Sequence, residues 1–150
     1  MPRLTNHYIM SIARCSNQFR TERLKEYGIL GQHCAYILRV SRQPGLTQDA
    51  IAKELHVNKS TAARQLAALE EKGYVRRCPS PQDQRALQVF PTDKTEKVLP
   101  KVRAVLQEWN DYVTDGFTDA EKELYRELLM RAAERARSFA SGEKQEDMPK

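Results

Sequence analysis

Residues 46–92 read LTQDAIAKELHVNKSTAARQLAALEEKGYVRRCPSPQDQRALQVFPT, and this stretch decides the fold. Thr47 and Asn58 are residue types that cap helix N-termini, and apolar residues at helical spacing follow each of them. The sequence therefore predicts a short helix after Thr47 and a second helix from Lys59 to about Lys72. A turn of three residues, 56–58, separates the two helices, and such a pair is a helix-turn-helix.

The second of these helices has two different sides. Ala62, Leu66 and Leu69 fall at i, i+4 and i+7, so they form an apolar stripe that must pack against the preceding helix. Ser60 and Arg64 point away from that stripe. The helix is therefore expected to bury one side and to leave a polar side, which carries an arginine, free to meet a partner.

Two short extended runs follow, Tyr74–Cys78 and Leu87–Phe90, and residues 79–85 (PSPQDQR) join them. This pattern predicts a β-hairpin with a polar, exposed tip. Helical hairpins alone are common in proteins that never bind DNA. A basic two-stranded hairpin directly after one is typical of a winged helix-turn-helix, and the sequence favours that fold.

The segments on either side of this unit are helical. Apolar residues at helical spacing predict helices over about 4–27 and 31–41 before it, and over about 93–115 and 119–140 after it. Pro100 is expected to kink or break the first turns of the third of these. The expected fold class is mainly α with a small β-hairpin wing, that is, a winged helix-turn-helix flanked by N- and C-terminal dimerisation helices.

The expected organisation is a single domain over residues 1–140. Its winged part covers about 42–92, its dimerisation helices cover about 4–27 and 93–140, and residues 141–150 form a polar, disordered tail. The two long terminal apolar stripes exceed what a small central winged domain covers by itself. They therefore support a homodimer, although packing within one chain is the alternative.

The composition agrees with a globular, helix-rich protein, with 40% hydrophobic and 30% charged residues and a net charge of +5 that favours an anionic partner. No apolar run is long enough to span a bilayer, and the first residues lack the apolar core of a signal peptide, so we expect a cytoplasmic protein. Cys15, Cys34 and Cys78 form no CxxC pair, and the three histidines form no ligand cluster. We therefore expect free thiols and no metal.

Reading of duplex DNA needs short polar and guanidinium side chains on an exposed helix face, and cations placed to meet phosphates. The second helix supplies the former and the hairpin supplies the latter, with Asp83 two residues before Arg85 to orient its guanidinium. A solvated charged surface is the alternative interpretation. The candidate residues are Lys59, Ser60, Thr61, Arg64 and Gln65 on the helix, and Arg76, Arg77, Asp83 and Arg85 in the hairpin.

The stretch IAKELHVNKSTAARQLAALEEKGYVRR, followed by PSPQDQRALQVFPT, resembles the MarR family of bacterial transcription regulators. The resemblance implies a homodimer with interlocked terminal helices, whose two winged domains reach successive major grooves of a pseudo-palindromic operator. It adds Ala63 to the recognition-helix positions 59–61, 64 and 65, and it makes Arg85 a minor-groove arginine. Two departures are Asp-Gln-Arg at 83–85, where many members have Asp-Arg-Arg, and Thr95, where a glycine often stands.

The resemblance also implies a repressor that is released by a small, often aromatic or anionic, effector. Tyr8, Tyr36, Arg39 and Trp109 are the candidate effector-pocket residues, although aromatic residues at helical spacing are more often part of a core. Some relatives sense oxidants through a cysteine in the first helix, where Cys15 lies. An oxidant-sensing regulator is therefore an alternative to the ligand-responsive one.

Other classes of function have less support from the sequence. A winged domain used only for protein contacts would replace Arg64 and Arg85 with apolar or acidic side chains, and this chain keeps both. The sequence contains no Gly-rich phosphate loop, GxSxG or HExxH motif, so we expect neither an enzyme nor a cofactor.

Overall fold

The computed structural model describes residues 5–142, and the chain divides into two compact units, residues 1–110 and 111–150. From residue 143 on, the predicted disordered tail lies outside the described residues. The elements are α1 (Thr5–Arg23), the 3-10 turns η1 (Lys25–Tyr27) and η2 (Gly31–His33), α2 (Cys34–Arg42), α3 (Gln48–Leu55), α4 (Lys59–Glu71), β1 (Val75–Pro79), β2 (Leu87–Pro91), α5 (Asp93–Val113) and α6 (Asp119–Ala140).

The helix-turn-helix is made by α3 and α4, and both of its predicted caps are present. The Thr47 hydroxyl accepts the Ala50 N–H at 3.1 Å, and the Asn58 side-chain oxygen accepts the Thr61 N–H at 2.8 Å. The turn between the helices places His56 at a φ of 55°, a left-handed conformation that is uncommon outside glycine. The caps and this residue fix where α3 stops and where α4 starts.

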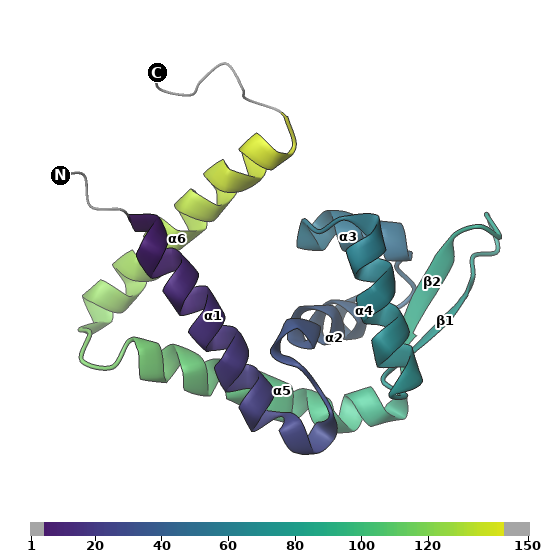
Figure 1. Ribbon diagram of the computed structural model, residues 1–150, viewed down its shortest axis with the longest axis horizontal. Helices are drawn as coiled ribbons and strands as arrows, with labels where there is room; N and C mark the ends of the chain where they lie inside the picture. Colours follow the sequence, from purple (N-terminus) through teal and green to yellow (C-terminus); the bar gives the residue numbers. More distant parts are fainter. Residues whose placement is uncertain (1–4, 143–150) are drawn as a thin grey trace. The chain divides into compact units, whose positions relative to one another are not determined.

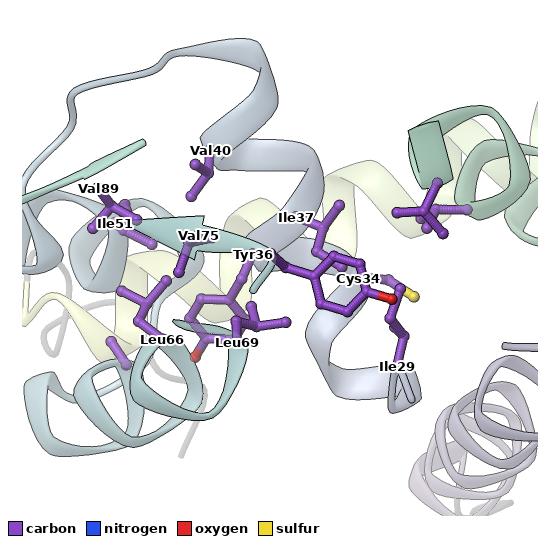
Figure 2. Packing of buried hydrophobic residues seen from close by; sticks show 14 of the residues in the cluster. Ile29, Cys34, Tyr36, Ile37, Val40, Ile51, Leu66, Leu69, Val75 and Val89 are labelled. Atoms are coloured by element: carbon purple, nitrogen blue, oxygen red, sulfur yellow. The ribbon is translucent and has the colours of Figure 1, made fainter. Parts of the chain in front are cut away.

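The core of the first unit is formed by residues of α2, α3, α4, α5 and the hairpin, whose backbones are drawn in Figure 1. Leu66 and Leu69 of α4 are fully buried, as the apolar stripe predicts. Figure 2 shows them gathered with Ile37 of α2 and with Val75 and Val89 of the two strands. The side of α4 opposite this cluster is therefore the side that can face another molecule.

The strands β1 and β2 pair antiparallel, with Arg77 opposite Val89 and Pro79 opposite Leu87. The hairpin also joins the chain ahead of α3, because the Val89 N–H donates to the Leu46 carbonyl at 2.9 Å and the Gly45 N–H donates to the Val89 carbonyl at 2.8 Å. These main-chain bonds hold β2 against the start of the helix-turn-helix. The predicted mainly α fold with a small β-hairpin wing is confirmed.

The path from the wing into α5 depends on Thr95, one of the two departures from the family pattern. Thr95 is fully buried, and its hydroxyl donates to the Tyr74 carbonyl. Tyr74 in turn donates its own hydroxyl to the Tyr27 carbonyl at 2.5 Å. The threonine therefore fastens the start of α5 to the residue just before β1.

Within the first unit α5 also packs against α1. The rings of Phe19 and Trp109 lie 5.4 Å apart, and Arg23 forms an ion pair with Glu108 at 2.9 Å. Pro100 does not break α5, which is helical throughout its 21 residues. The proline costs one backbone hydrogen bond, because it has no N–H to donate to the carbonyl of Glu96, four residues earlier.

In the second unit, α6 begins at a capping box. The Thr118 hydroxyl accepts the Glu121 N–H at 3.2 Å, and the Glu121 carboxylate accepts the Thr118 N–H at 2.8 Å. The described part of α6 has no buried residue, and several of its large apolar side chains are exposed. No helix within residues 5–142 combines the length and apolar character needed to cross a membrane.

Candidate nucleic-acid interface

The free side of α4 carries the residues expected for DNA recognition. Because Ala62, Leu66 and Leu69 face the core, Lys59, Ser60 and Arg64 are turned outward and are exposed. Thr61, Ala63 and Gln65 are half-buried. The structure thus brings the six candidate positions onto one helix but gives three of them far better access to a partner than the others.

Local hydrogen bonds order the first turn of α4. Ser60 donates its hydroxyl to the Asn58 side-chain oxygen at 2.8 Å, and Arg64 Nη2 lies 3.5 Å from the Thr61 hydroxyl. Lys59 Nζ forms an exposed ion pair with Asp49 of α3 at 3.2 Å. The polar end of the helix is therefore organised before any partner binds, and Asp49 offsets the charge of Lys59.

Gln65 is turned toward the segment that precedes α2. Its side-chain oxygen accepts the Gln32 amide at 3.3 Å, and its side chain also bonds His33. Burial lowers the pKa of His33 below its ordinary value, the nearby charge of Lys72 lowers it further, and the bond with Gln65 opposes the shift. The Leu30 N–H donates to His33 Nδ1 at 3.1 Å, as suits the neutral imidazole. Gln65 therefore connects α4 with a buried, neutral histidine.

The hairpin tip exposes Arg85, as predicted, but Asp83 acts on it differently from the expectation. The Asp83 carboxylate accepts the backbone N–H of Arg85 at 3.0 Å, and the Asp83 carbonyl accepts the Ala86 N–H at 3.0 Å. Among the described residues no ion pair joins the two side chains. Asp83 thus shapes the turn that presents Arg85, because an Asx turn satisfies the carboxylate locally, and it leaves the guanidinium unpaired.

The other two hairpin arginines have different surroundings. Arg76 is exposed, and its guanidinium lies over the Phe90 ring, 5.0 Å from the centroid. Arg77 is half-buried and bonds Glu70 of α4 and Gln48 of α3. The sequence suggested the same role for both residues, but only Arg76 and Arg85 present a guanidinium to solvent.

The four candidate effector-pocket residues occupy separate surroundings. Tyr36 belongs to the buried cluster in Figure 2, and burial raises its pKa. Arg39 is ion-paired with Glu54 of α3, and Trp109 packs on Phe19. Tyr8 is 61% exposed on α1.

Two hollows of about 600 Å³ in the first unit are lined by other residues. The first is lined by charged side chains. The second lies beside α3 and the start of α4, and both Lys53 and Lys59 line it. Lys53 was not among the residues predicted from the sequence. The linings are Glu22, Arg23, Lys25, Glu26 and Lys101 for the first, and Asp49, Ala50, Ala52, Lys53, Val57, Asn58 and Lys59 for the second.

The cysteines differ in access. Cys15 is exposed on α1, Cys34 is buried, and Cys78 is half-buried in β1. Burial raises the pKa of the Cys34 thiol and so keeps it protonated. Residues 5–142 hold no group of three or more His, Cys, Asp or Glu side chains placed to bind a metal ion.

Comparison with known proteins agrees with this geometry. A family model described as MarR family matches residues 27–86, and the HTH-type transcriptional regulator YybA of Bacillus subtilis is 31% identical over 120 residues, which cover 80% of each chain. A crystal structure of MarR is 32% identical, with a TM-score of 0.85, and covers 96% of this chain and 99% of its own. The chain belongs to the MarR family.

The fold is shared beyond these relatives. A MarR-family structure from Listeria monocytogenes complexed with 26mer DNA is 22% identical, has a TM-score of 0.83, and covers 100% of this chain and 99% of its own. Membership of the MarR family makes this protein a winged-helix, DNA-binding regulator of transcription. The β1–β2 hairpin is the wing of this winged-helix fold.

Proposed function

We propose that this MarR-family protein is a homodimeric repressor that binds a pseudo-palindromic duplex operator and is released by a small-molecule effector. DNA binding is assigned to residues of about 42–92, and dimerisation to about 4–27 and 93–140. Because the operator lies on the chromosome, we expect the protein in the cytoplasm. The Listeria structure with the same fold contains DNA, which supports the proposed partner.

The observation that carries this proposal is the division of α4 into two sides. Its apolar side is sealed in the core, while Lys59, Ser60 and Arg64 are exposed beyond a cap that orders them. Arg64 has the reach to hydrogen-bond a guanine edge in the major groove. The wing adds Arg76 and Arg85, two exposed guanidinium groups suited to phosphates or to a narrow minor groove.

Dimerisation is supported by apolar side chains that are exposed on both terminal helices. Monomeric soluble proteins rarely expose so many large apolar residues in contiguous groups. A second copy of the chain would cover them with a self-complementary surface. These residues are Tyr8, Ile9, Met10 and Ile12 on α1, and Leu124, Leu128, Leu129, Met130 and Phe139 on α6.

The test uses the full-length protein and fragmented DNA of its host. Fragments retained by the wild-type protein are sequenced, and the enriched site is compared with a scrambled duplex in fluorescence-anisotropy titrations. We expect a pseudo-palindromic site bound at least about 10³-fold more tightly than random sequence at the same salt concentration. Equal affinity for the selected and scrambled duplexes would refute a sequence-specific regulator.

The repressor and effector parts of the proposal need a separate measurement. Transcription in vitro from a promoter that contains the selected site should fall when the protein is added. A rise would show an activator instead. Small aromatic acids are the first probes for release, because the effectors implied by the family are aromatic or anionic.

A further inference from the structure

Arg77 joins three elements of the winged domain. Its backbone N–H donates to Glu70 Oε2 at 2.6 Å, and its guanidinium donates to Glu70 Oε1 from Nε at 3.2 Å and from Nη2 at 3.1 Å. Nη1 donates to the Gln48 side-chain oxygen at 2.7 Å. One arginine of β1 is thus tied to the last turn of α4 and to the first residue of α3.

These bonds occupy the groups that a phosphate contact would need. The Arg77 side chain is only 20% exposed, and that of Glu70 is 37% exposed. A guanidinium that turned to a phosphate would give up its bonds to Glu70 and Gln48, and would leave the Glu70 carboxylate with only the Arg77 backbone N–H. Arg77 therefore differs from Arg76 and Arg85, whose guanidinium groups are accessible.

The two strands of the wing have separate anchors. Main-chain bonds to Gly45 and Leu46 hold β2, while Glu70 holds β1 at Arg77. The base of the hairpin is also held by the buried Val75 and Val89, so the bond to Glu70 restrains the part of the hairpin from Arg77 outward. Continued beyond Pro79, the strand register places Arg85 opposite residue 81, four residues or roughly 13 Å from Arg77 at the rise of a β-strand, so a tilt of about 10° moves Arg85 by about 2 Å. A displacement of that size is enough to break a hydrogen bond.

We propose that Glu70 and Arg77 are positioning residues, a clamp that fixes the wing relative to the recognition helix and so places Arg85 on DNA. This inference rests on the proposed function, because it requires that the wing meets duplex DNA. Arg77 then contributes to affinity through Arg85 and makes no phosphate contact of its own.

The two roles predict opposite effects of one substitution. Glu70→Gln removes a negative charge from a DNA-binding surface. If Arg77 binds phosphate, this change leaves affinity equal or higher, because it frees a cation. If the pair is a clamp, Glu70→Gln lowers affinity even though the protein becomes more positive. Glu71→Gln is the matched control, since the neighbouring Glu71 is exposed and its loss changes the net charge equally.

The experiment compares full-length wild type, Glu70→Gln, Arg77→Gln, the double variant and Glu71→Gln on the selected duplex. Thermal unfolding first establishes a temperature at which all of them are folded. We expect Glu70→Gln and Arg77→Gln each to bind about tenfold more weakly, which is the worth of one well-placed arginine contact. The double variant should bind no more weakly than the weaker single variant, and Glu71→Gln should bind at least as tightly as wild type.

A second readout separates positioning from a general loss of structure. Arg85→Ala is added to wild type and to Glu70→Gln, and its cost in the Glu70→Gln background should fall from about tenfold to about twofold. Hydrogen exchange without DNA should quicken at residues 75–79 in Glu70→Gln but not in Glu71→Gln. An unchanged cost of Arg85→Ala, or unchanged binding by Glu70→Gln, would overturn the clamp while leaving DNA binding intact. A wild-type protein that binds no duplex would instead overturn the proposed function and the clamp with it.

Discussion

Arg64 and Arg85 carry the same charge, but their different surroundings give them different expected contributions to DNA binding. Arg64 lies on the exposed side of α4, the proposed recognition helix, and a guanidinium in a major groove discriminates between base edges. Arg85 lies at the tip of a hairpin, where a minor groove is read mainly by its width and potential. We expect Arg64→Ala to reduce the ratio of operator to scrambled-duplex affinity, and Arg85→Ala to weaken both affinities by a similar amount, about 1 to 3 kcal/mol.

Anisotropy titrations of both variants on the two duplexes measure this difference. Arg103→Ala on the exposed surface of α5 is the control, because it removes an equal charge outside the winged domain. If Arg85→Ala left both affinities at the wild-type value, the wing would not touch DNA.

His33 gives a pH dependence whose direction follows from its surroundings. Burial, reinforced by Lys72, holds its pKa below the value of about 6.5 found in unfolded chains. Below that pH the unfolded chain binds a proton that the folded protein refuses, so the stability contribution present above about pH 6.5 is lost as the pH falls toward the folded pKa. The free energy of unfolding should therefore decrease from pH 7.5 to pH 5.5.

Urea unfolding at these two pH values tests the assignment with two variants. His33→Gln should remove part of the decrease, whereas His7→Gln on the exposed start of α1 should leave it unchanged. A decrease of the same size in His33→Gln and in wild type would show that other groups cause it.

Single residues also show which contacts could be predicted from the sequence. The exposure of Arg64 and Arg85 followed from the helical period and from the polar tip. The partner of Asp83 did not, because a backbone N–H and a guanidinium both lie within reach of its carboxylate and only the turn geometry selects between them. The bond between Arg77 and Glu70 joins a strand to a helix, and no local sequence pattern predicts such a contact.

At the scale of elements, the sequence predicted the features that depend on hydrogen bonds between residues close together in the sequence. Thr47, Asn58 and Thr118 each cap the expected helix, and in each case the donor is the backbone N–H three residues beyond the cap. The strands begin and end within one residue of their expected bounds. Pro100 stays inside α5, because packing of the helix as a whole outweighs one lost hydrogen bond.

The cap of α4 links stability to DNA binding, and two substitutions separate these effects. Asn58→Ala removes the acceptor for the Thr61 N–H and should cost about 1 kcal/mol of stability. It should also weaken operator binding, because it frays the turn that carries Lys59 and Ser60. Asn58→Asp keeps an equally good cap and should keep the stability, but its charge beside the phosphates should weaken binding.

Chemical unfolding and operator titration of the same samples measure the two effects. Thr118→Ala, at the cap of α6, is the control that should lose stability without a direct effect on α4. An Asn58→Asp variant that binds the operator as tightly as wild type would show that the start of α4 lies away from the DNA backbone.

At the scale of the whole molecule, the most informative feature is how much apolar surface the terminal helices expose. In the second unit, Leu124, Leu128 and Leu129 all lie on α6 with about half of their surface accessible. The sequence predicted a helix with an apolar stripe over this segment, but the pattern alone does not say whether the stripe packs within the chain or on a partner. Their exposure in a single chain supports the partner.

Leu128→Glu should therefore turn a dimer into a monomer, because it would bury a carboxylate in an apolar interface. Sedimentation of the full-length variant measures the change, and Arg137→Glu, at an exposed position nine residues and so about 180° around α6 from Leu128, should stay dimeric. Dimerisation also sets the electrostatics of DNA binding. A dimer that meets roughly 6 to 10 phosphates loses affinity with a log-log salt slope of about −0.9 for each contact. A monomer meets one half-site, so the slope for Leu128→Glu should fall to about half of the wild-type value. Wild-type protein that sediments as a monomer would remove the basis for this prediction. A dimeric Leu128→Glu variant with an unchanged slope would place the interface away from this side of α6.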